Sequence, residues 1–128
     1  MNITRFLLII MLTISPFSCS KTPVLSFCEG IDKDGKGVQC GKKFSTGDLT
    51  AVVTISERFE TETLTVIASK KTNYKNEKVS DFSHAVGADT SSTAIPLSFY
   101  IEGEYLIEVH GKDNRLLGSE WIQIIDTY

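Results

Sequence analysis

Hydrophobic and polar residues alternate along most of the chain after residue 48, and a period of two is typical of strands with one buried face. The alternation runs through residues 49–55, 63–68, 95–101 and 103–110, whereas no helical period of useful length occurs. The pattern therefore predicts a core built from the following strand positions: Leu49, Ala51, Val53, Ile55, Leu64, Val66, Ala68, Ile95, Leu97, Phe99, Ile101, Tyr105, Ile107 and Val109.

The last 26 residues carry the clearest pattern. A strand from Gly103 to His110 leads into the turn-forming residues 111–115, and a second strand follows at residues 116–125. In that second strand Trp121 and its alternate neighbours oppose Ile122 and Ile124, and we expect Trp121 to pack in the core with Phe99 and Tyr105. The segment predicts a closing β-hairpin.

Six or seven strands at spacings near a dozen residues favour a β-sandwich over a barrel. The segment GEYLIEVHGKDNRLLGSEWIQII is similar to the closing hairpin of bacterial immunoglobulin-like domains, with Tyr105 near the start of the penultimate strand. The chain departs from antibody domains because it has no Cys–Trp–Cys core. The resemblance implies an all-β fold, an Ig-like antiparallel β-sandwich of about seven strands.

The chain begins with a different kind of pattern. A positive start ending at Arg5 precedes the apolar run FLLIIMLTI at residues 6–14. That run is too short to cross a bilayer but suits the hydrophobic region of a signal peptide. We therefore expect residues 1–18 to be a signal peptide, and the protein to be exported.

Ser18 and Cys19 resemble the end of a bacterial lipoprotein signal, of the loose kind found in spirochaetes, although Pro16 and Phe17 depart from the usual lipobox. The resemblance implies that Cys19 is lipidated with diacylglycerol and a fatty acid such as palmitate, which together anchor a protein durably. Residues 19–26 would then be a lipid-anchored tether and residues 27–128 a single domain, held at the outer membrane and facing the periplasm or the cell surface. Ordinary secretion, with cleavage after Ser20, remains an alternative.

The composition narrows the choice of partners. The net charge is −3, and the lysines occur as pairs and not as a clustered basic face. Binding to nucleic acid needs such a face, so we expect no nucleic-acid partner. The expected partners are the membrane, through the lipid anchor, and a protein.

With Cys19 assigned to the signal, Cys28 and Cys40 remain in an oxidising compartment. A disulfide between them would close a short loop and contribute about 3 kcal/mol by the chain-entropy estimate. Two free thiols are the alternative, and a zinc site is disfavoured because the chain has no CxxC pair beside a histidine.

No cluster of residues predicts catalysis, a metal or a cofactor. An EF-hand loop starting at Asp32 fails, because Lys36 and Lys43 fall where oxygen ligands are needed. His84 and His110 lie on predicted strands, and nothing in their spacing requires a metal. There is no G-x-S-x-G elbow, so we expect a protein that is not an enzyme.

Two polar loops are the places where recognition is expected, because loops at the ends of a sandwich carry function most often. The charged loop 70–78 contributes Tyr74, Lys75 and Asn76, and the loop 87–92 contributes Asp89. The sequence thus favours a lipid-anchored envelope or surface binding module that recognises a protein or host ligand. The alternatives are an accessory lipoprotein that assembles a periplasmic or outer-membrane complex, and an enzyme inhibitor.

Overall fold

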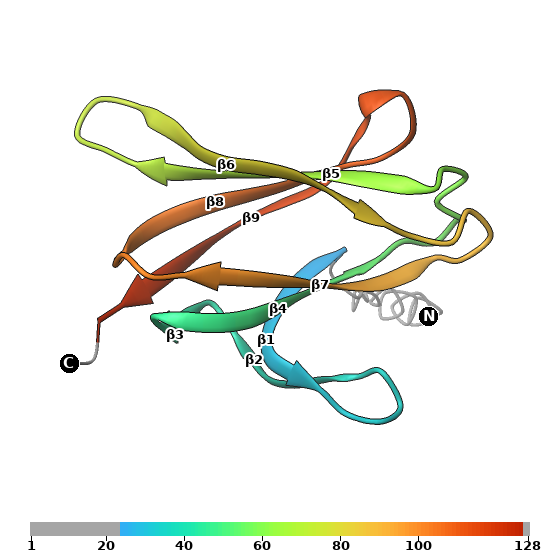
Figure 1. Cartoon of the computed structure of the whole chain (residues 1–128), viewed down its shortest axis with the longest axis horizontal. Coiled ribbons are helices and arrows are strands. Elements are labelled where there is room, and N and C mark those ends of the chain that lie inside the picture. Colours follow the sequence, from blue (N-terminus) through green and yellow to red (C-terminus); the bar gives the residue numbers. More distant parts are fainter. Residues whose placement is uncertain (1–23, 127–128) are drawn as a thin grey trace, which may run out of the picture.

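The computed structural model describes residues 24–126, which fold into nine strands and one short 3₁₀ turn (Figure 1). The signal segment and Cys19 lie outside the described residues. The elements are β1 (Leu25–Ile31), β2 (Gly37–Gly41), β3 (Lys43–Ser45), β4 (Gly47–Thr54), β5 (Thr63–Lys71), β6 (Asn76–Ala85), β7 (Ser92–Phe99), β8 (Gly103–His110), η2 (Lys112–Asn114) and β9 (Leu116–Ile125). Among these residues no helix is long and apolar enough to cross a bilayer.

The strands form two packed sheets, which confirms the predicted all-β sandwich. One sheet has the order β2-β1-β4-β7 and the other has the order β3-β9-β8-β5-β6. All neighbouring strands are antiparallel except β3 and β9, which run parallel. The strand count of nine exceeds the predicted six or seven because β1, β2 and β3 lie before residue 48, in a stretch where the sequence predicts no strand.

The pairing of the strands resembles that of an immunoglobulin-like sandwich. The non-consecutive pairs β4–β7 and β5–β8 correspond to strands B–E and C–F, and β9 and β6 take the places of G and C′. The hydroxyl of Tyr105 donates a hydrogen bond of 2.6 Å to the carbonyl oxygen of Ile101, four residues upstream. This is the tyrosine corner of such domains, and it lies at the position that the sequence predicts. Gly103 has a φ of 154°, which lets the chain turn between the Ile101 carbonyl and Tyr105.

The core lies between the sheets and is filled by the alternating residues. Leu49, Ala51 and Val53 of β4 face Leu64 and Val66 of β5 across the sandwich, and all are buried. Phe59, an isolated apolar residue in the β4–β5 connection, is only 4% exposed and closes one end of the core. β1 adds Leu25, so the first strand begins two residues before the predicted start of the domain at residue 27.

Two core expectations are wrong. Ile101 is 64% exposed, because β7 ends at Phe99 and Ile101 belongs to the connection to β8. Trp121 is 40% exposed, because in β9 it is Ile122 and Ile124 that point inward. The charged loop 70–78 is also shorter than expected, since β5 continues to Lys71 and β6 already begins at Asn76.

Cys28 and Cys40 form a disulfide, which confirms the predicted pairing. The two residues lie directly opposite each other in the β1–β2 hairpin. Gly37 packs against the bridge so closely that a Cβ atom there would collide with the Cys28 sulfur and lie 2.6 Å from the Cys40 sulfur. Every residue of β2 is exposed, so the disulfide holds a strand that contributes no side chain to the core.

Candidate functional site

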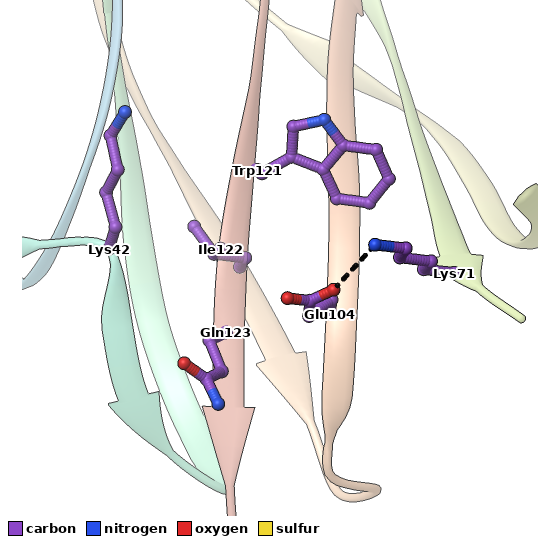
Figure 2. Close-up of a pocket in the computed structure, with 6 residues that line it drawn as sticks. All are labelled: Lys42, Lys71, Glu104, Trp121, Ile122 and Gln123. Carbon is purple, nitrogen blue, oxygen red and sulfur yellow. Dashed lines mark ion pairs between the residues drawn. The ribbon is translucent and has the colours of Figure 1, made fainter.

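The outer face of the five-stranded sheet carries an exposed aromatic side chain, Trp121 of β9. Trp121 lies opposite Leu106 of β8, which in turn lies opposite Ser69 of β5, so the three residues form one row across the sheet. Figure 2 shows the indole extending from β9 over the neighbouring strand, close to the side chains of Glu104 and Lys71. The position follows from the alternation, because Ile122 and Ile124 occupy the inward side of the same strand.

A hollow of about 350 Å³ opens beside this tryptophan, and we call it the Trp121 hollow. Its lining residues are Lys42, Lys71, Glu104, Trp121, Ile122 and Gln123. They come from β5, β8, β9 and the residue between β2 and β3. Its volume falls at the lower end of the range for small-ligand pockets.

Two ion pairs involve the charged residues of the Trp121 hollow. Lys71 Nζ lies 3.4 Å from Glu104 Oε1 across the outer face, and the dashed line in Figure 2 marks this contact. Lys42 Nζ donates a 2.9 Å hydrogen bond to Glu120 Oε1 at the edge of β9. All four side chains are substantially exposed, so each pair contributes little to stability. Their main consequence is that each lysine of the hollow has a carboxylate beside it, Glu104 within the lining and Glu120 outside it.

Two hydrogen-bonding groups in the hollow have no partner among the described residues. The indole N–H of Trp121 finds no acceptor, and the side-chain amide of Gln123 makes no hydrogen bond, although its backbone N–H donates to the Lys42 carbonyl at 2.8 Å. The Gln123 amide offers both a donor and an acceptor to a ligand. The hollow therefore combines an aromatic surface with exposed polar groups that make no hydrogen bond to the described residues.

The predicted binding loops lie at opposite ends of the sandwich. Tyr74 and Lys75 occupy the β5–β6 turn, where Tyr74 is 95% exposed, and Asn76 is the first residue of β6. The Thr72 hydroxyl closes this turn with a 2.6 Å bond to the Lys75 carbonyl. Asp89 lies in the β6–β7 connection, at the other end of the molecule in Figure 1. The structure thus does not bring the four residues into one site.

A second hollow, of about 310 Å³, lies between the edge strands β6 and β7. It is largely apolar, and its exposed lining includes Val79, Phe82, Tyr100 and Ile101. Outside this hollow, His84 Nε2 of β6 lies 3.0 Å from the hydroxyl of Thr93 of β7, and this contact links the two sheets. Burial lowers the pKa of His84 below its ordinary value of 6.5.

The two histidines lie on opposite faces of the five-stranded sheet. His84 pairs with Leu64, whose side chain points into the core, whereas His110 pairs with Thr65 on the outer side. His110 Nε2 lies 3.3 Å from Glu108. Within residues 24–126 no group of three potential ligands could hold a metal ion. The two histidines therefore form no shared ligand pair.

Sequence reasoning missed the Trp121 hollow because it assigned the tryptophan to the core. Residues 121–125 read apolar on both faces, and the polar Gln123 on the same face as Trp121 was the signal that this face is exposed. No protein-family model matches the chain, and no characterised protein matches it either.

Proposed function

We propose that the protein is an exported, lipid-anchored binding module of the cell envelope that recognises a protein or host ligand and has no catalytic role. The observation that carries the proposal is the exposure of Trp121 beside unpaired polar groups on the outer sheet face. Tryptophan has a large apolar surface, and aromatic residues of this kind are enriched where proteins bind their partners. Recognition by the outer face of β9, β8 and β5 accounts for a tryptophan that contributes little to the core.

The start of the domain supports an anchor at one end of the sandwich. The Thr54 N–H donates a 2.8 Å bond to the carbonyl of Val24, so the chain enters the domain level with the end of β4. Cys19 precedes Val24 by five residues, and a fully extended chain of that length spans at most about 18 Å. A lipid on Cys19 would hold this end of the domain close to the membrane.

The two ends of the sandwich would then have different surroundings. The β4–β5 and β6–β7 connections and η2 share the end where the chain enters, and the β5–β6 turn with Tyr74 lies at the far end (Figure 1). The membrane-proximal connections carry more carboxylates than basic groups: Glu57, Glu60, Glu62, Asp89 and Asp113 against Arg58, Lys112 and Arg115. Such an end has no attraction for anionic lipid, which leaves the tether as the means of attachment.

The anchor is tested by fractionation of cells that produce the wild type or Cys19→Ser. We expect the wild type in the membrane fraction and the variant in the soluble exported fraction, because the lipid supplies the attachment. Proteinase K added to intact and lysed cells distinguishes an outward-facing domain from a periplasmic one. Membrane retention of Cys19→Ser would contradict lipid anchoring.

Binding is tested with the soluble Cys19→Ser protein added to isolated cell envelopes and, separately, to host cells. We expect saturable sedimentation with one of these targets, and we expect Trp121→Ser to reduce it. Tyr74→Ser is the matched control, because Tyr74 is an exposed aromatic residue at the far end of the domain. Equal retention of the wild type and Trp121→Ser on every target would contradict recognition by the outer sheet face.

A further inference from the structure

We propose that the Trp121 hollow binds one or two sugar units of an uncharged glycan. This inference rests on the proposed function and names the ligand class of the same site. Three features of the hollow support it: a flat aromatic surface, hydrogen-bonding groups of both kinds without a partner among the described residues, and lysines that are each paired with a carboxylate.

The aromatic surface suits the ring of a sugar. A pyranose presents C–H groups on one face and hydroxyl groups around its rim. Trp121 is 40% exposed, and its indole projects over β8 in Figure 2, so part of the ring surface is available for a sugar ring to stack on. Stacking on an aromatic ring uses both the apolar contact area and the attraction of C–H groups to the negative π face.

Polar groups line the same hollow as the indole. Gln123 follows Trp121 by two residues, on the same face of β9, and its amide is unpaired among the described residues. The Trp121 N–H is also unpaired there. Glu104 lies opposite Gln123 on β8 and still has acceptor capacity beyond its 3.4 Å contact with Lys71. The rim thus offers donors and acceptors together, which is what a hydroxyl group needs.

The ion pairing of both lysines disfavours an anionic ligand. Lys71 is paired with Glu104 and Lys42 with Glu120, so a phosphate or carboxylate would have to compete with an existing carboxylate at each lysine. A cation would have to compete with the lysine that is already paired with each carboxylate. A neutral ligand bonds to both members of a pair without separating them.

A peptide added as an extra strand fits this hollow poorly. Such peptides gain affinity by pairing their backbone with an exposed sheet edge. The floor of the hollow includes Glu104 on β8, and β8 lies between β9 and β5 with both sides already paired. The hollow therefore favours a ligand that is recognised by ring stacking and side-chain hydrogen bonds.

The test uses the fact that Trp121 is the only tryptophan in the chain. The soluble Cys19→Ser protein, with its disulfide formed, is titrated with two uncharged probes, chitotetraose and cellotetraose, and with the anionic probe tetragalacturonate. We expect a saturable change in tryptophan emission with an uncharged probe and a weaker response to the anionic one. The absence of a saturable change with both uncharged probes up to about 10 mM, a concentration that mostly fills a site with a dissociation constant of about 1 mM, would overturn the proposal.

Variants identify the site and keep the result interpretable. Gln123→Ala retains the tryptophan and should weaken binding of the probe about tenfold, whereas Tyr74→Ser should leave it unchanged. Trp121→Phe is measured by calorimetry, which does not depend on tryptophan fluorescence, after circular dichroism has confirmed its fold. We expect a similar loss of affinity for the probe. Equal affinities for the wild type and Gln123→Ala would overturn the assignment to this hollow.

Failure of this proposal differs from failure of the proposed function. If no glycan binds but retention on envelopes or host cells still depends on Trp121, the glycan assignment is wrong and the binding module stands, with a protein as its ligand. If retention is also indifferent to Trp121→Ser, both are wrong.

Discussion

The tyrosine corner offers a quantitative test of the fold, because one substitution removes one hydrogen bond and little else. Tyr105→Phe deletes the hydroxyl that donates to the Ile101 carbonyl at 2.6 Å. It keeps the ring, which is 4.7 Å from the ring of Phe99 between centroids and is almost wholly buried. The packing term should therefore stay close to its wild-type value.

The magnitude follows from the surroundings of the two partners. A typical intramolecular hydrogen bond contributes about 1 kcal/mol to stability. Ile101 is 64% exposed, so water can bond to the carbonyl that the substitution frees, and no further penalty for an unsatisfied group is expected. For a domain of about 100 residues, a loss of about 1 kcal/mol lowers the melting temperature by about 5 °C.

The assay is thermal and denaturant unfolding of Tyr105→Phe, with Tyr100→Phe as the matched control because Tyr100 is 75% exposed. We expect a shift of the midpoint for the first variant and none for the second.

Burial also raises the pKa of Tyr105 above its ordinary value of 10.0. The folded state thus favours the protonated phenol, and this stability is present below about pH 10 and lost as the pH rises through the raised pKa. Equal stability of the two variants at neutral pH would refute the reasoning. So would a loss of stability above about pH 10 that is the same in Tyr105→Phe as in the wild type.

Three further substitutions test other parts of the structure. Gly37→Ala should cost about 1–3 kcal/mol in denaturant unfolding, because its Cβ meets both disulfide sulfurs, whereas Gly30→Ala has open space and should cost much less. Ile107→Ala should cost about 2–5 kcal/mol because the residue is fully buried, against about 0.5 kcal/mol or less for the exposed Ile101→Ala. Because burial lowers the pKa of His84, the unfolded state binds more protons than the folded state between the lowered pKa and the ordinary value of 6.5, so stability should fall as the pH drops through 6.5 towards the lowered pKa. His84→Gln should flatten that fall, and identical pH profiles of the two proteins would contradict it.

Alternation predicts this fold well wherever a strand has one apolar face. β4, β5 and β8 place their alternating residues in the core as predicted, because burying a period-two stripe leaves only one orientation for each strand. The disulfide could be predicted for a different reason, namely that two cysteines remained after Cys19 was assigned to the signal. Tyr105 could be placed because its position relative to the penultimate strand is characteristic of the architecture.

The candidate site could not be predicted in the same way. In β9 both faces read apolar near Trp121, so periodicity alone could not choose the buried one. The Trp121 hollow joins Lys42, Lys71 and Glu104, which are far apart in sequence and meet only because β9, β8 and β5 are neighbours. β3 was missed because its three residues are too few to show a period.

Photo-cross-linking in intact cells tests the central claim most directly, that the outer face of β9, β8 and β5 is the binding surface. A photoreactive amino acid replaces Ser69 of β5 on that face or Ser98 on the outer face of the four-stranded sheet, in the anchored protein. The account predicts discrete adducts, to protein or glycan, from position 69 that are absent from position 98 and are lost when Trp121→Ser is added. Adducts of equal yield from both positions, or adducts from position 69 that survive Trp121→Ser, would contradict it.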